Sequence, residues 1–88
     1  MPIKVVYRAE FFREGDHYVG LAPELNVSSF GSTLKKAKGS LQEAVQAFVE
    51  ECEHMGTLDE VMEETGFSRK GDPWFPRQPV SAELLTVG

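Results

Sequence analysis

Residues 34–55 read LKKAKGSLQEAVQAFVEECEHM. Apolar residues recur in this stretch every three or four positions, which places them on one stripe of an α-helix at about 100° per residue. Gly56 follows and can adopt the left-handed conformation that ends many helices, and Ser32 or Thr33 can cap the first turn with a hydroxyl. The sequence therefore predicts a long amphipathic helix with one face on a core. The predicted stripe consists of Leu34, Ala37, Leu41, Ala44, Val45, Phe48, Cys52 and Met55.

A β-hairpin is predicted before this helix. Apolar and polar side chains alternate from Ile3 to Phe12, as in a strand with one buried face. If residues 13–15 form a three-residue loop with Gly15 in the left-handed region, the strong apolar residues of both strands fall on one face. A shift by one residue would turn the second strand over, so we predict the three-residue loop. The pairs then expected are Phe11 with His17, Ala9 with Val19, and Tyr7 with Leu21.

The remaining segments complete an α+β fold. Pro23 ends the second strand, because proline cannot donate to a ladder, and Val27–Phe30 is predicted as a short third strand. Thr57 and Glu60 have the spacing of a capping box, which predicts a second helix from Leu58 to about Thr65.

The last part of the chain is predicted to be a loop followed by a strand. Residues 68–79 contain three prolines and form a loop rich in turn residues. Residues 80–87 are β-prone and are predicted as a fourth strand. The expected architecture is an antiparallel three-stranded sheet on one long helix, with a short second helix and a C-terminal strand.

Length and composition indicate one small globular domain. The chain has 88 residues, which we assign to a single domain over 1–88 with its core in residues 3–66 and no separate DNA-binding domain. One cysteine, Cys52, allows no internal disulfide and favours a reducing cytoplasm. No apolar run approaches the roughly 18 residues of a membrane span, and no signal peptide is recognisable at the N-terminus.

The net charge is −5, from 9 basic and 14 acidic residues. Because nucleic-acid binding depends on neutralising phosphates with lysine and arginine, this balance disfavours direct binding. Two interpretations of the acidic surplus remain open, a basic protein partner and simple solubility.

No residue pattern predicts catalysis, a cofactor or a metal site. Cys52 lies on the apolar stripe and is expected to be buried, and on a helix it diverges from His54. His17 has only Asp16 beside it at ligand spacing. The sequence also contains no nucleophile elbow, phosphate-binding loop or dinucleotide fingerprint.

Two features suggest contact with a partner. Trp74 and Phe75 lie in the proline-rich loop and either cover the core or anchor a partner. Glu50, Glu51 and Glu53 crowd the C-terminal end of the long helix, where they oppose the helix dipole. That placement reflects either a charged contact surface or ordinary variation of an exposed helix.

The order of several short motifs resembles the HicB-like antitoxin family. The motifs are FFREGDHYVG at residues 11–20, PEL at 23–25, FGSTL at 30–34, and Ala37 followed by LQEA at 41–44. The resemblance covers about residues 5–55. It implies a partial ribonuclease H-like fold with a fourth strand beside the first, and assembly into a homodimer or homotetramer. Its implied function is to bind and neutralise a small basic RNA-cleaving toxin of the HicA type.

The sequence departs from this family in two places. Many members carry a C-terminal DNA-binding domain, but only 22 residues follow Gly66 here, so direct operator binding is not expected. Lys35 and Lys36 replace acidic residues that usually follow the threonine. Three other hypotheses remain: an orphan homo-oligomeric relative, a small scaffold that only self-associates, and a metal-dependent nuclease on a ribonuclease H-like scaffold.

Overall fold

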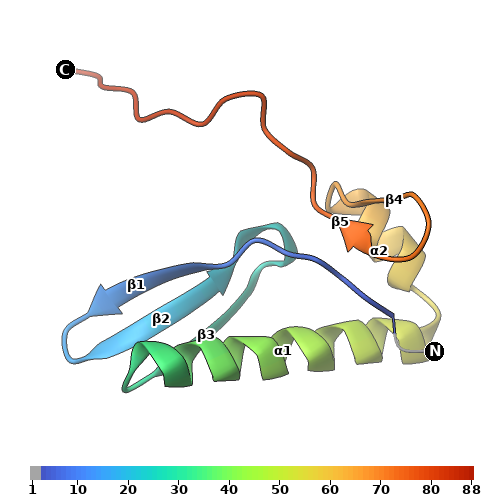
Figure 1. The fold of residues 1–88 in the computed structure, drawn as a ribbon, viewed down its shortest axis with the longest axis horizontal. Helices are drawn as coiled ribbons and strands as arrows, with labels where there is room; N and C mark the ends of the chain where they lie inside the picture. Colours follow the sequence, from blue (N-terminus) through green and yellow to red (C-terminus); the bar gives the residue numbers. More distant parts are fainter. Residues whose placement is uncertain (1–2) are drawn as a thin grey trace.

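A computed structural model describes residues 3–88 and shows an α+β fold (Figure 1). A three-stranded antiparallel sheet with order β1-β2-β3 lies against the long helix α1. The fold class expected from the sequence is thus confirmed. Along the chain the elements are β1 (Glu10–Glu14), β2 (His17–Ala22), the 3-10 helix η1 (Pro23–Leu25), β3 (Val27–Gly31), α1 (Leu34–Met55), α2 (Leu58–Glu64), β4 (Ser68–Arg69) and β5 (Trp74–Phe75).

Helix α1 has the bounds that its sequence predicts. Thr33 is the N-cap, and its hydroxyl accepts a hydrogen bond from the Lys36 amide at 3.1 Å. Gly56 ends the helix with φ 73°, in the left-handed region. Most of the predicted stripe is buried or half-buried, and Val49 belongs to it as well. Leu34 and Met55 at the two ends are exposed.

The predicted three-residue hairpin loop is wrong. Glu14 pairs with His17, so the loop consists only of Gly15 and Asp16. Gly15 has φ 62° at the first loop position, where a two-residue hairpin of type II′ requires glycine. Phe11 consequently faces Gly20 instead of His17. Val19 and Leu21 lie on the outer face of the sheet, opposite the face that carries Gly20 and Gly31.

Small residues explain this register. The sheet face toward α1 carries Gly20, Ala22, Ser29 and Gly31, which lets the helix approach the strands closely. Ser29 Oγ donates to the Ala37 carbonyl at 3.1 Å. A Cβ built on Gly31 would lie 2.5 Å from the Ala37 nitrogen, so only glycine fits there. The alternation predicts large apolar residues of β2 on the inner face, whereas the structure places its small residues there, beside Phe11 and Val27 of the neighbouring strands.

The predicted first strand is only partly a strand. Residues 3–9 are extended but do not pair with β2, because the ladder between the two strands ends at Glu10 and Leu21, just before Pro23 (Figure 1). Within this segment only Val5 makes a β-bridge, a parallel one with Trp74. The predicted alternation holds for Ile3, Val5, Tyr7 and Phe11, which pack against the core. It is wrong at Ala9, which was expected on the same face and is exposed.

The chain after α1 differs from its prediction in three respects. Helix α2 has Thr57 as N-cap, but the Thr57 hydroxyl donates to the Cys52 carbonyl at 3.4 Å and forms no capping box. Residues 68–79 contain the small hairpin of β4 and β5 instead of only a loop. The predicted strand over 80–87 is wrong, because this segment is an exposed coil that pairs with nothing in the described chain.

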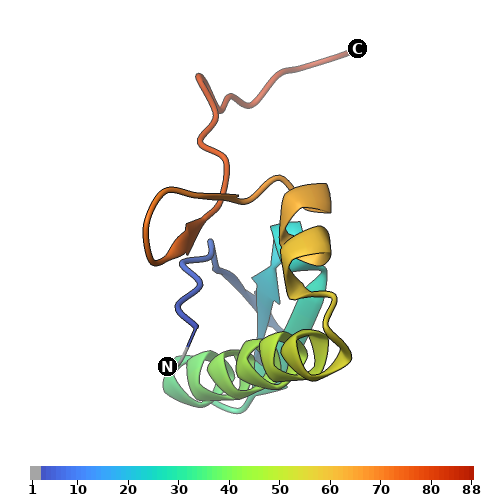
Figure 2. The ribbon, with the colours of Figure 1, turned by 90° about the vertical axis from the view of Figure 1, so that its right-hand side faces the viewer.

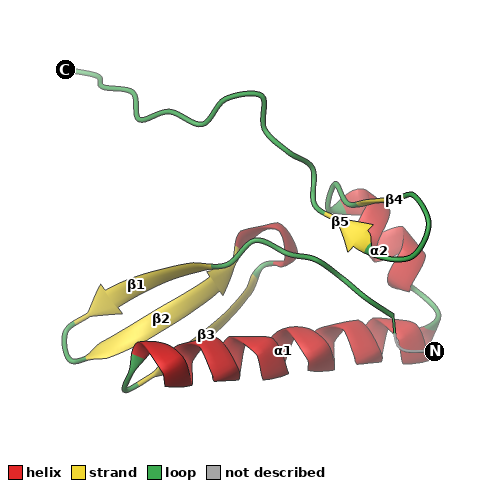
Figure 3. Ribbon diagram, viewed as in Figure 1, coloured by secondary structure: helices red, strands yellow, loops and turns green. Residues whose placement is uncertain are grey.

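The views place these parts relative to one another. Helix α2 stands on the C-terminal end of α1, with the hairpin of β4 and β5 beside it (Figure 3). The segment after β5 leaves on the side remote from α1 (Figures 1 and 2). None of the described helices is long and apolar enough to cross a membrane.

Candidate partner-binding surfaces

Carboxylates gather at one end of the molecule. Between Gly39 and Ser68 the chain has eight acidic residues and no lysine or arginine, although the whole chain has 9 basic residues. Seven of the eight lie on the C-terminal part of α1 and on α2, and all seven are exposed. We call them the acidic surface. It consists of Glu50, Glu51, Glu53, Asp59, Glu60, Glu63 and Glu64.

The three glutamates predicted on α1 differ in what they lie beside. Glu50 and Glu53 border an apolar groove beside residues 3–7, whereas Glu51 does not line it. The carboxylates of α2 extend the surface, and the sequence analysis missed their contribution. The sequence contained a signal for this surface. Lys35, Lys36 and Lys38 stand in the first turns of the helix, and a long run without lysine or arginine follows them.

The predicted aromatic pair is divided by the fold. Trp74 is 4% exposed and belongs to the core, whereas Phe75 is 48% exposed. The Trp74 indole Nε1 is buried without an acceptor, and the Arg69 guanidinium lies 5.6 Å from the ring centroid. Trp74 therefore has the first of the two predicted roles and covers the core. Of this pair, only Phe75 is exposed enough to contact a partner.

The outer face of the sheet carries exposed aromatic side chains that no other described segment covers. Phe12 is 49% exposed and Phe30 72% exposed, with the half-buried Val19 between them in the ladder. His17 packs edge-on against Phe30, with ring centroids 6.2 Å apart. Neighbouring exposed aromatic side chains are typical of protein–protein contacts.

An apolar groove runs between the N-terminal segment and α1. Its wider part lies at the C-terminal end of the helix, and a second part continues along Gln42 to Lys38. The floor includes Val45 and Val49 of α1, and Tyr7 lines the opposite wall. Burial raises the pKa of the Tyr7 phenol above its ordinary value of 10.0.

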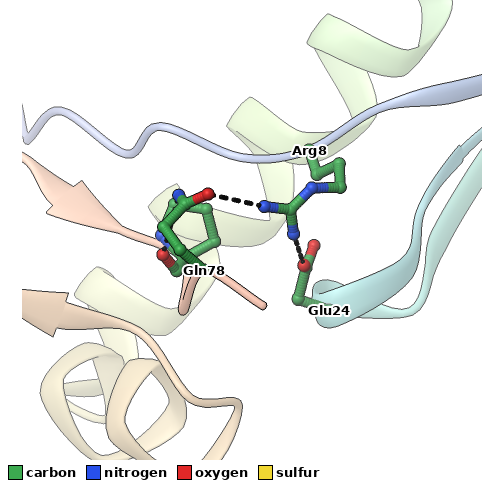
Figure 4. Close-up of polar contacts among 4 residues, drawn as sticks. Arg8, Glu24 and Gln78 are labelled. Atoms are coloured by element: carbon green, nitrogen blue, oxygen red, sulfur yellow. Dashed lines mark hydrogen bonds and ion pairs between the residues drawn. The ribbon is translucent and has the colours of Figure 1, made fainter. Parts of the chain in front are cut away.

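Arg8 joins three segments of the chain (Figure 4). Its guanidinium forms an ion pair with Glu24 of η1 and donates to Gln78 Oε1 at 3.3 Å. Gln78 Nε2 in turn donates to the Pro76 carbonyl at 3.3 Å. The second Glu24 oxygen, Oε1, is buried without a donor. These contacts hold the start of the C-terminal segment beside η1.

The residues considered for chemistry remain apart. Cys52 is a buried free thiol, as expected from the apolar stripe, whereas His54 is exposed. His17 Nδ1 lies 3.6 Å from Asp16 Oδ1, beside the hairpin loop. Among residues 3–88 no three histidine, cysteine, aspartate or glutamate side chains are grouped so that they could hold a metal ion.

Comparisons of the chain with models of known families, with curated proteins and with solved structures find no match. The resemblance to HicB-like antitoxins therefore stays a prediction from the short motifs.

Proposed function

We propose that this protein is a non-catalytic, HicB-like binding protein that neutralises a small basic RNA-cleaving toxin in the cytoplasm. The observation that carries the proposal is the acidic surface, with seven exposed carboxylates on two adjoining helices and no lysine or arginine among them. Such a field attracts a positively charged partner and speeds its association at low ionic strength. The motif order of residues 5–55 supports the HicB-like character, and the single free thiol of Cys52 suits a reducing compartment.

The acidic surface also suits this role because glutamates occupy an unfavourable place on α1. Glu53 stands in the last turn of the helix, where its dipole disfavours negative charge by roughly 0.3–1 kcal/mol at low salt, and Glu50 and Glu51 stand in the turn before it. A cationic partner bound there would offset this cost. Solubility alone needs no concentration of charge at one end.

The test compares two variants of equal net charge. One carries Glu50→Gln, Glu51→Gln and Glu53→Gln, and the other carries Glu10→Gln, Glu14→Gln and Glu83→Gln, all at exposed positions. Each variant is immobilised and exposed to native cell extract, and any small basic protein retained by the wild type is purified and assayed for RNA cleavage.

The first variant is expected to retain less of the basic protein and to suppress its RNA cleavage more weakly than the second. Binding should also weaken steeply as salt is raised, because exposed charges are screened. Equal retention by the two variants, or no basic RNA-cleaving protein bound to the wild type, would contradict the proposal.

A second candidate is an orphan relative that forms only homodimers or homotetramers. The apolar outer face with Phe12 and Phe30 favours self-association, because a face of this kind is stabilised by covering it. Light scattering of Phe30→Asp against the wild type tests this candidate. A smaller assembly in the variant supports it, and an unchanged mass contradicts it.

A further inference from the structure

We propose that the groove beside α1 receives residues 80–87, here called the tail, from a second copy of this chain. The inference is independent of the proposed toxin partner. It concerns how copies of the protein assemble, and it assigns a role to the most exposed apolar segment of the molecule.

The tail carries apolar side chains with nothing to cover them. Its four large apolar residues are each at least 87% exposed, and the segment makes no backbone hydrogen bond to the rest of the described chain. Leaving several such side chains in water is unfavourable, because each gains stability when it is buried. The four are Val80, Leu84, Leu85 and Val87.

The extended segment beside the groove has backbone groups without hydrogen-bond partners. Along residues 5–9 the only backbone hydrogen bond recorded is that from the Val6 amide to the Trp74 carbonyl, at 2.8 Å. Most of this extended segment therefore has unpaired amides and carbonyls. An unpaired strand edge above an apolar floor is the arrangement to which an added strand binds, through backbone pairing and alternate side chains. Val45 and Val49 supply the floor.

The two parts match in length. Eight extended residues span about 26 Å at roughly 3.3 Å each. From Lys38 to Glu53, the limits of the groove on α1, the helix rises about 22 Å at 1.5 Å per residue. The tail is thus long enough to fill the groove from end to end.

Charge selects the face of the tail that enters. In an extended strand Val80, Ala82 and Leu84 share one face, and Glu83 lies on the other with Leu85. Charges of both signs border the groove, with Glu50, Glu53 and Lys4 at its wider part and Lys38 at the other end. Entry of the first face keeps the Glu83 carboxylate out of the apolar groove, where burying a charge is unfavourable, so Leu84 points to the floor and Leu85 points outward.

The tail that fills the groove comes from a second copy, because the tail begins on the face of its own N-terminal segment that lies opposite the groove. Gln78 is held by Arg8, and Arg8 and Tyr7 project to opposite faces of the extended segment. Tyr7 lines the groove, whereas Arg8 lies beside Glu24 of η1. From there the tail runs away from α1 (Figures 1 and 2). A symmetric exchange lets each copy fill the groove of the other.

The test detects the contact between chains directly. Full-length protein carrying one isotope label is mixed with protein carrying another, and nuclear Overhauser effects are recorded only between differently labelled chains. Contacts from the Leu84 methyl groups to those of Val45 or Val49 are expected. If such contacts occur only within one chain, or if the tail stays without contacts in an assembled sample, the proposal is overturned.

Two matched variants test which face enters. Leu84→Asp is expected to raise the dissociation constant of the exchanged dimer at least about tenfold, a change of about 1.4 kcal/mol. It should also remove the slow hydrogen exchange of the amides in residues 5–9. Leu85→Asp introduces the same change at the next position and should leave both properties close to the wild type. An exchanged dimer that survives Leu84→Asp overturns the assignment.

Discussion

Val5 and Trp74 form a parallel bridge that joins the start of the described chain to the segment after α2. The Trp74 amide donates to the Lys4 carbonyl at 2.9 Å, and the Trp74 carbonyl accepts from the Val6 amide at 2.8 Å. The backbone thereby fixes the indole over the core while the neighbouring Phe75 stays exposed. This bridge and the hydrogen bond from Arg8 to Gln78, and not a strand over 80–87, connect the first segment to the C-terminal part of the fold.

Trp74→Ala is expected to lower the free energy of unfolding by about 3–5 kcal/mol, as for other large aromatic residues truncated in a core. Phe75→Ala should cost less than about 1 kcal/mol, because half of that side chain already contacts water. Trp74→Phe should restore most of the loss, since the Trp74 Nε1 has no acceptor to lose. Urea denaturation measures all three variants, and equal losses for Trp74→Ala and Phe75→Ala would show that the indole does not cover the core.

Gly31 and Gly39 should respond in opposite directions to alanine. A Cβ at Gly31 would meet the backbone of α1, which cannot yield without moving the helix, so Gly31→Ala should cost about 1–3 kcal/mol. Gly39 lies inside α1 with nothing within 4 Å of a built Cβ, so Gly39→Ala should stabilise by up to about 1 kcal/mol. Thermal unfolding followed by circular dichroism measures both. Tolerance of alanine at Gly31 would mean that β3 and α1 are farther apart than described.

Val19 and Val45 test the register of the hairpin with the same substitution. Val19 lies on the outer face of the sheet and Val45 is 3% exposed in the core. Val45→Ala should cost about 2 kcal/mol from lost burial and the cavity left behind, and Val19→Ala less than about 1 kcal/mol. Chemical denaturation of dilute protein is the measurement. A larger loss for Val19→Ala would instead favour the three-residue loop, which turns Val19 inward.

Tyr7 should make stability fall in alkaline solution. Because burial raises the pKa of the Tyr7 phenol above 10.0, the folded state holds this proton more tightly than the unfolded state. The resulting contribution is fully present below pH 10 and is lost as the pH rises through the folded-state pKa. Tyr7→Phe should therefore show a shallower decline of the free energy of unfolding above pH 10, with pH 7 as reference. Identical slopes in the two proteins would argue against a buried phenol.

The sequence by itself determined the elements whose signals are local. The apolar period and the caps at Thr33 and Gly56 fixed both ends of α1, because side chains and backbone within one turn decide where a helix starts and stops. Pro23 likewise ended β2, since its nitrogen has no proton for the ladder.

Only the tertiary structure decided the contacts between distant segments. The hairpin register followed from how closely α1 approaches Gly31 and how closely the Phe11 ring lies to Gly20, packing distances that alternation of polar and apolar residues does not contain. The pairing of Val5 with Trp74 likewise depends on the path of the chain through α2. The acidic surface has both origins, because the carboxylates of α1 and α2 are visible in the sequence, but the angle between the two helices brings them to one end of the molecule.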